Sequence, residues 1–208
     1  MFELIDVKSD QWLSNDPAPF ISDLKDLAEQ HDLLIAADFG HGLFEFNVLK
    51  ALGQVPRFIG LNVQTNSDNF GFNPFTKHER YDYLSIDERE CRVATHDRLT
   101  PRLELAGATI RERIRRSASV TLGTAGSLYF DDEGRSFTCP TFFRDVIDTT
   151  GAGDAYFAIT SVLSKLRAPG PVVPFIGNCY AGLKTRIIGN KAAVTKVDLV
   201  RTVQSLLR

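Results

Sequence analysis

Short apolar runs alternate with longer amphipathic segments along most of this 208-residue chain. The runs at 32–38 and 57–62 are compact and apolar, which is typical of strands buried on both faces of a sheet. The segments 21–30 and 43–52 carry apolar residues at helical spacing. Strands that alternate with helices favour a layered α/β fold with a mostly parallel sheet.

The segment 63–77 interrupts this alternation, because it is rich in Asn, Phe and Gly and has no clear period. A loop of that length is either a functional segment or a surface excursion whose phenylalanines pack back on the body. Elsewhere the alternation continues. The same criteria predict strands at 81–86 and 119–122, a hairpin from 127–130 and 136–139 around Gly134, and helices at 101–116 (capped by Thr100), 152–166, 172–188 and 196–207 (capped by Thr195).

Composition narrows the classes of protein. The chain has 24 basic and 26 acidic residues and 43% hydrophobic residues, which is the profile of an ordinary globular domain. The near-balanced charge argues against nucleic acid as a partner, and no apolar run reaches the roughly 18 residues of a membrane helix. The first ten residues have no signal-peptide pattern. The three cysteines are widely spaced, so we expect neither a zinc site nor a disulfide framework. The same cysteine usage favours a cytoplasmic location.

The strongest chemical feature is the segment 148–154, which reads DTTGAGD. Gly151, Ala152 and Gly153 lie where a loop enters a predicted helix, so their N–H groups are expected to form an anion hole for a phosphate. Asp154 then falls in the first helical turn, where its carboxylate can accept the proton of an attacking hydroxyl. The alternative is a plain glycine turn in which Asp154 serves only the helix dipole.

This segment closely resembles the signature of the PfkB family of carbohydrate kinases, which have the ribokinase-like fold. The segment 120–126 (VTLGTAG) resembles the T-x-G-x-x-G nucleotide loop of that family. The segment 87–90 (DERE) resembles its N-x-x-E motif, with Asp in place of Asn. The segment 37–43 (ADFGHGL) is similar to D-Y-x-K-G of the heptose-phosphate kinase branch, with His41 in place of Lys.

The resemblance implies ATP and Mg²⁺ as cofactors and assigns roles to matching residues. Asp154 would be the catalytic base. Asp87 and Glu90 would help to place magnesium, although Asp with Glu three residues later is equally a helix capping box. Asp38 is a weaker candidate for substrate contact. The residues expected beside the nucleotide are Thr121, Gly123, Gly126, Thr149 and Asn178.

Other readings of the sequence have less support. Asp38-Phe39-Gly40 matches the magnesium motif of protein kinases, but the other motifs of those enzymes are absent from the sequence. No Gly-Lys pair occurs, which excludes a Walker-type P-loop. His31, His78 and His96 are scattered, and we expect them at the surface.

We therefore expect residues 1–208 to form one ribokinase-like α/β/α domain, corresponding to the C-terminal, nucleotide-binding portion of the family's fold. The early G-G-x-x-x-N motif and the β lid of the family have no counterpart in the sequence. The expected function is phosphoryl transfer from ATP to a sugar or sugar phosphate, weak or absent in this chain alone. The alternative is a non-catalytic nucleotide-binding or interaction module. A second copy of the chain, or a segment that supplies the early strands, is the expected protein partner.

Overall fold

The computed structural model of the chain describes residues 16–67, 69–99, 101 and 116–208. Its centre is a six-stranded sheet whose strands lie side by side in chain order. The first four strands run parallel, and the last two are added antiparallel at one side. The predicted mostly parallel sheet is confirmed. The strands are β1 (Leu33–Asp38), β2 (Phe58–Val63), β3 (Tyr83–Asp87), β4 (Ser117–Thr121), β5 (Ser127–Phe130) and β6 (Ser136–Cys139).

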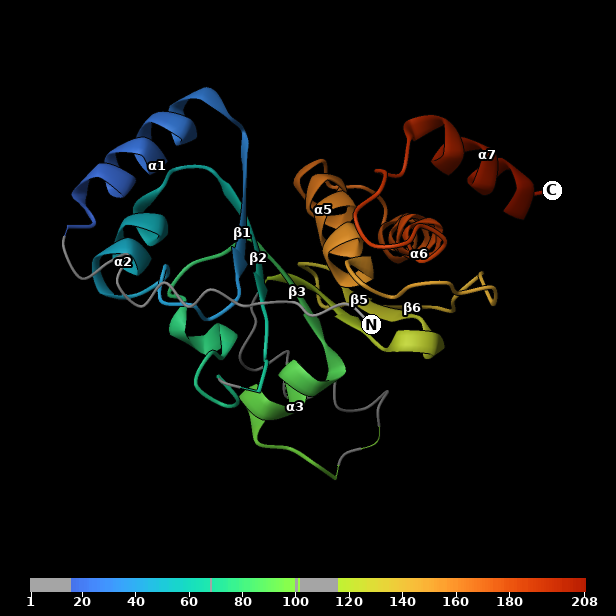
Figure 1. The fold of residues 1–208 in the computed structure, drawn as a ribbon, viewed down its shortest axis with the longest axis horizontal. Helices are drawn as coiled ribbons and strands as arrows, with labels where there is room; N and C mark the ends of the chain where they lie inside the picture. Colours follow the sequence, from blue (N-terminus) through green and yellow to red (C-terminus); the bar gives the residue numbers. More distant parts are fainter. Residues whose placement is uncertain (1–15, 68, 100, 102–115) are drawn as a thin grey trace.

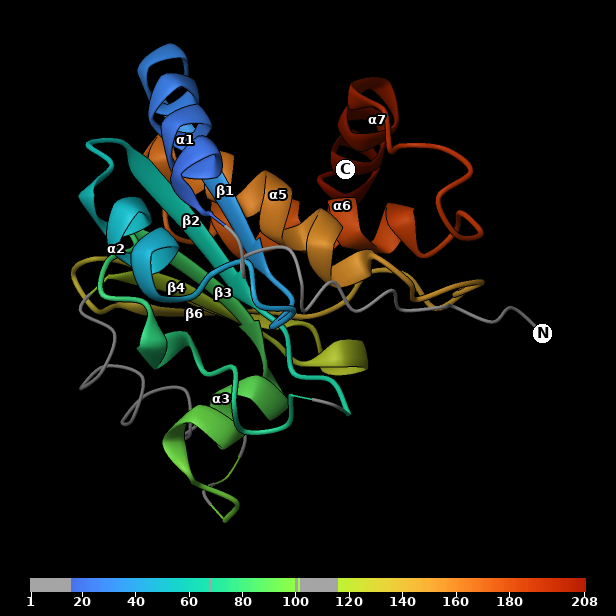
Figure 2. The same ribbon diagram turned by 60° about the vertical axis from the view of Figure 1, so that its left-hand side comes forward.

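Helices cover both faces of the sheet and give three layers (Figure 1). On one face α1 (Ala18–Gln30) packs against α2 (Phe46–Gln54). On the other face α5 (Ala152–Lys165) packs on β1, β2 and β3, with α6 (Val172–Lys184) beside it. Outside these, α7 (Lys196–Leu206) lies against α6 (Figure 2). The expected α/β/α arrangement is confirmed.

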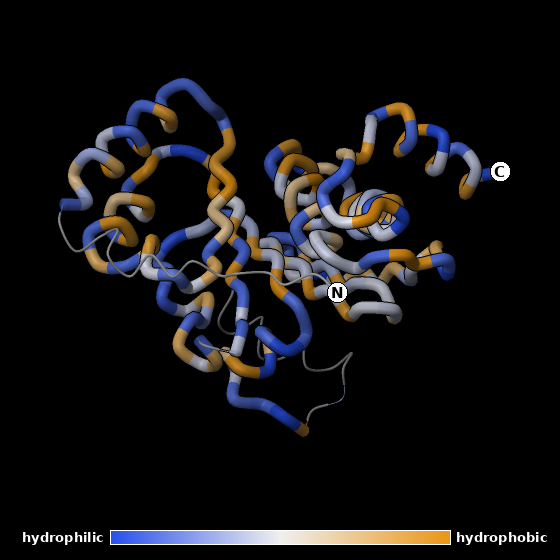
Figure 3. Tube along the Cα trace, viewed as in Figure 1, coloured by the Kyte–Doolittle hydropathy of each residue, from blue (hydrophilic) through white to orange (hydrophobic). Residues whose placement is uncertain are grey.

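Alternate side chains of β3 show how the two faces of the sheet are filled. Leu84 and Ile86 belong to the larger apolar cluster, together with Val48 of α2. Tyr83 belongs to a second cluster with Phe157 of α5. Successive strand residues point to opposite faces, so both helix layers have an apolar surface to pack against. Along the outer helices the hydropathy alternates between hydrophilic and hydrophobic, as amphipathic segments require (Figure 3).

Local sequence signals set several helix ends. At the start of α3 (Glu88–Thr95), Asp87 and Glu90 form a complete capping box. Thr195 caps α7 in the same way with Asp198, which confirms the predicted cap. Each box satisfies two N–H groups that the helix leaves unpaired.

Two helix predictions need correction, and a third concerns residues that the structure does not describe. α2 begins at Phe46 rather than at residue 43, after a loop in which Gly40 and Gly42 take positive φ. α6 ends at Lys184 rather than at residue 188, because the chain turns there toward the loop before α5. The predicted helix at 101–116 falls almost entirely outside the described residues.

Side-chain amides hold the segment that follows β2 against the body. Asn66 and Asn69 each accept the other's backbone N–H, at 2.8 and 2.9 Å. Asn73 donates to the carbonyl of Asp38 at 3.0 Å. Phe75 is 1% exposed and Phe72 is 86% exposed, so the phenylalanines of this segment divide between the core and the surface. Within the part of the chain that the structure describes, no helix is long and apolar enough to cross a membrane.

Candidate active site

The segment 148–154 forms a tight turn that leads into α5. Gly151 has φ 75°, which glycine adopts without steric cost, and the helix begins at Ala152. The carboxylate of Asp148 accepts the N–H groups of Thr150 and Gly189, at 2.9 and 2.7 Å. These hydrogen bonds lower the pKa of Asp148 to about 2. Asp148 therefore stays ionised and ties the turn to the loop after α6.

The first turn of α5 presents amide hydrogens that the helix itself does not use. The N–H of Ala152 donates to the carbonyl of Thr149 at 3.1 Å. The next two positions are Gly153 and Asp154, where the positive end of the helix dipole favours an anion. A phosphate at this turn would therefore meet the amides on either side of Ala152 rather than that of Ala152 itself.

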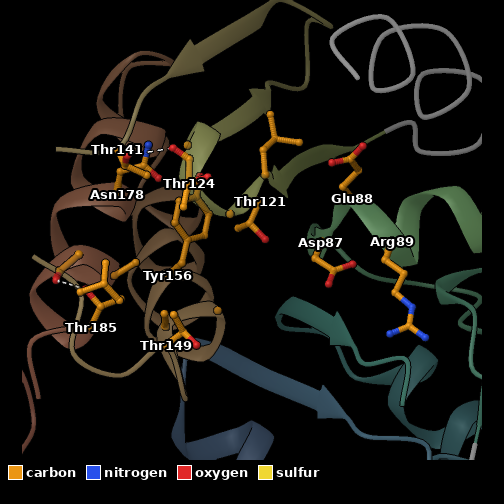
Figure 4. Close-up of a pocket in the computed structure, with 18 of the residues that line it drawn as sticks. Asp87, Glu88, Arg89, Thr121, Thr124, Thr141, Thr149, Tyr156, Asn178 and Thr185 are labelled. Atoms are coloured by element: carbon orange, nitrogen blue, oxygen red, sulfur yellow. Dashed lines mark hydrogen bonds between the residues drawn. The ribbon is translucent and has the colours of Figure 1, made fainter. Parts of the chain in front are cut away.

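A cavity of about 1750 Å³ opens in front of this turn (Figure 4). Thr149 and Tyr156 lie on one side, and Asp87 and Arg89 of the β3–α3 junction lie across from them, with Thr121 between (Figure 4). The sequence-predicted residues that line the cavity are Asp87, Thr121, Gly123, Gly126, Thr149, Ala152, Gly153 and Asn178. The structure thus brings together all five residues expected beside a nucleotide.

Asn178 of α6 uses its amide to hold the wall of this cavity. Its Nδ2 donates to the carbonyls of Cys139 and Pro140, at 2.8 and 3.0 Å. Its Oδ1 accepts the hydroxyl of Ser127 at 3.0 Å. Asn178 therefore fixes the hairpin of β5 and β6 against α6, and its side chain shapes the cavity through that packing.

A row of buried hydroxyl groups continues from Ser127 into the sheet. The hydroxyl of Tyr156 is 3.1 Å from Ser127 Oγ and 3.2 Å from Ser119 Oγ. The hydroxyl of Tyr83 is 2.8 Å from the same Ser119 Oγ. Burial raises the pKa of Tyr156 to about 12, so this side chain is a neutral hydrogen-bonding group. The row connects α5 and α6 to the centre of the sheet.

Asp154 is exposed at the start of α5 and contacts the segment after β2. Gln64 Nε2 donates to its Oδ1 at 3.1 Å, across 90 positions of sequence. The structure therefore places a neutral hydrogen-bond donor beside the carboxylate expected to act as base. The sequence gives no signal for Gln64, since the contact depends on the packing of α5 against β2.

Glu90 is buried and connects α3 to the segment after β2 through hydrogen bonds. Its two carboxylate oxygens accept the N–H groups of Asp87 and Thr65, at 2.8 and 3.0 Å. Burial and the charge of Asp87 raise the pKa of Glu90 to about 7. The capping-box alternative for this pair is thus confirmed. Among the described residues, no three His, Cys, Asp or Glu side chains gather as a metal cluster.

Asp38, the weaker candidate for substrate contact, lies at the end of β1 and is 2% exposed. Its Oδ2 is 2.9 Å from Lys77 Nζ and 2.9 Å from His78 Nε2. The surface position predicted for His78 is wrong, because this side chain is buried against Asp38. Asp38 does not line the cavity, and its contacts assign it to anchoring the segment 64–78.

The anchoring role of Asp38 predicts a pH-dependent stability. Burial opposes ionisation, but hydrogen bonds from His78 and Lys77 outweigh it and lower the pKa of Asp38 below its usual 3.8. Asp38→Asn should cost about 2 kcal/mol of unfolding free energy at neutral pH. The cost should be full above pH 3.8 and shrink as the pH falls through the lowered folded-state pKa.

The free energy of unfolding of the unsubstituted chain and of Asp38→Asn is measured by urea unfolding between pH 3 and 7. The matched control is Asp32→Asn, because Asp32 is exposed just before the same strand, and its replacement should change stability by less than about 0.5 kcal/mol. A cost for Asp38→Asn that does not vary with pH would contradict the anchoring ion pair.

Comparison with solved structures defines the class of fold. Ribokinase of Arabidopsis thaliana, solved with ribose and ATP, matches with a TM-score of 0.69 and 16% identity, over 88% of this chain and 59% of that one. Phosphofructokinase-2 of Escherichia coli matches with a TM-score of 0.71 and 14% identity, over 90% and 62%. The chain therefore has the ribokinase-like fold.

The family resemblance is confirmed by two further comparisons. Residues 79–170 match the family model of the pfkB family carbohydrate kinases. The bifunctional protein HldE of Citrifermentans bemidjiense is 24% identical over 161 residues, which are 76% of this chain and 32% of that protein. The chain thus spans about a third of the length of the first curated relatives and about six tenths of the solved ones.

Proposed function

We propose that this chain binds ATP in the cavity before α5 and serves the transfer of its γ-phosphoryl group to a hydroxyl of a sugar or sugar phosphate. The observation that supports this most is the glycine turn 148–154, which opens onto a large cavity lined by all five residues expected beside a nucleotide. The similarity to ribokinase supports a sugar as the acceptor, and the resemblance of the segment 37–43 to the heptose-phosphate kinase branch favours a heptose phosphate.

In this proposal, the nucleotide lies along the wall formed by Thr121, Gly123, Gly126 and Asn178, with Thr149 near its phosphates. The γ-phosphate meets the N–H groups around Gly151 and Gly153. Asp154 accepts the proton of the acceptor hydroxyl. The oxygen–phosphorus bond to the acceptor forms as the bond from the γ-phosphorus to the β-phosphate oxygen breaks, and the electron pair leaves with ADP.

Mg²⁺ fits the acidic side of the cavity only in part. Asp87 lines the cavity, whereas both oxygens of Glu90 are occupied by backbone N–H groups. Asp87 would therefore face the ion, bound chiefly by ATP phosphates, and Glu90 would fix the backbone that carries Asp87. When bound, the ion would neutralise the developing phosphate charge.

A thermal-shift experiment tests nucleotide binding. ATP with Mg²⁺ at about 100 times Kd should stabilise the folded chain by about 2.7 kcal/mol, which raises Tm by about 5–10 °C in a chain of this size. ADP release that requires a sugar phosphate then separates a kinase from a non-catalytic binding module. If both ATP and ADP leave the Tm of the chain unchanged, the proposed nucleotide site is wrong.

A further inference from the structure

Lys184, the last residue of α6, carries its charge into the protein rather than into solvent. It is 8% exposed, although a lysine at a helix end ordinarily extends into water. Its Nζ donates to the carbonyl of Thr150 at 3.0 Å and to the carbonyl of Gly189 at 2.7 Å. A buried ammonium is retained only where such partners compensate its lost hydration.

The carbonyl of Thr150 belongs to the peptide between Thr150 and Gly151, within the glycine turn 148–154, which we call the anion turn. Because that peptide is planar and trans, its C=O and the N–H of Gly151 point in opposite directions. Lys184 holds the oxygen side, so the N–H of Gly151 is directed away from the ammonium. A Cβ added to Gly151 would be only 3.4 Å from Lys184 Cε and 3.7 Å from Nζ. The ammonium therefore lies directly behind this peptide.

Asp148 completes the arrangement from the other side of the same two residues. Its carboxylate accepts the N–H groups of Thr150 and Gly189, at 2.9 and 2.7 Å, while Lys184 binds their carbonyls. The charge of Lys184 contributes to the lowered pKa of Asp148. Two opposite charges thus clamp one pair of residues, and both charges are supplied by the chain itself.

We propose that Lys184 is a positioning residue for the anion turn, and that its ammonium group serves there as a built-in monovalent cation. The inference rests on the proposed ATP site. The ammonium orients the peptide between Thr150 and Gly151, polarises it, and places positive charge behind the phosphate. Removal of the ammonium leaves two carbonyl oxygens facing a space the size of a small cation, which K⁺ or NH₄⁺ from solution would occupy.

The experiment compares the 208-residue chain with Lys184→Met and Lys184→Gln, in tetramethylammonium chloride and in KCl at equal ionic strength. In tetramethylammonium, whose cation is too large for the space, both variants should have a lower Tm and about tenfold weaker ATP binding. KCl should restore most of both losses in the variants and change neither property in the unsubstituted chain. AMP, which lacks the distal phosphates, should bind all three chains equally.

Lys165→Met is the matched control, because Lys165 is exposed at the end of α5, and it should behave as the unsubstituted chain in both salts. A loss in Lys184→Met and Lys184→Gln that KCl does not restore would overturn the cation role, as would an equal response to KCl in every chain. If no chain binds ATP, the proposed function fails. The potassium-specific rise in Tm of the two variants still decides whether Lys184 replaces a cation.

Discussion

Replacing Asp154 with asparagine should lower sugar-dependent turnover by about 10²–10⁴-fold, the usual contribution of a general base. ATP binding should stay nearly unchanged, because the amide keeps the shape of the carboxylate and its contact with Gln64, a 3.1 Å hydrogen bond in the structure. Turnover is measured as ADP release that depends on a sugar phosphate, in a form of the protein that has this activity. ATP binding is measured separately as a shift in Tm.

The control for this substitution is Asp23→Asn, since Asp23 is exposed on α1, in the helix layer on the opposite face of the sheet from α5. It should leave both turnover and ATP binding at their original values. Near-normal turnover in Asp154→Asn would remove the role of base from this residue. Loss of ATP binding together with turnover would instead indicate that Asp154 supports the turn.

Gly126→Ala should destabilise the chain by about 3–5 kcal/mol, through backbone strain and a steric clash together. Gly126 has φ 101° and ψ −133°, a conformation that is essentially restricted to glycine. A Cβ there would meet the carbonyl oxygen of Cys139 and lie 2.8 Å from Pro140 Cα. Both neighbours are backbone atoms of the adjoining strand end, so they cannot move aside as a side chain would.

Gly123→Ala separates the two causes, because Gly123 has φ 59° and no atom within 4 Å of its added Cβ. It should cost only about 1–2 kcal/mol, the strain of the left-handed backbone. Denaturant unfolding of the three chains gives the comparison. Equal costs for Gly123→Ala and Gly126→Ala would show that the close approach to Cys139 contributes nothing.

Features encoded by neighbouring residues could be predicted from the sequence. The hairpin strands 127–130 and 136–139 match β5 and β6 at every boundary, because Gly134 takes positive φ in the turn between them. The nucleotide-side residues are brought together as the family motif implied. The hairpin follows from a local turn, whereas the nucleotide-side residues come from separate segments and were predicted only through their resemblance to the family motifs.

Features that depend on distant partners could not be predicted. His78 looked like a surface residue, and its burial requires Asp38, 40 positions earlier. Lys184 falls inside the predicted helix 172–188 and has no local signal, and its burial depends on the carbonyls of Thr150 and Gly189 in two separate loops. Gln64 has no local pattern that connects it with Asp154. In each case the deciding contact joins segments that only the folded sheet brings together.

The row of hydroxyls between Asn178 and the sheet has a defined direction of proton donation. Asn178 Nδ2 donates to two backbone carbonyls, so its Oδ1 must accept, and Ser127 gives it the single proton of its hydroxyl. Tyr156 is then the donor to Ser127 and retains only its lone pairs for Ser119. The amide of one helix residue thus sets the polarity of the whole row. The hydrogen bonds at the wall of the cavity and at the centre of the sheet therefore depend on one another through the orientation of a single amide.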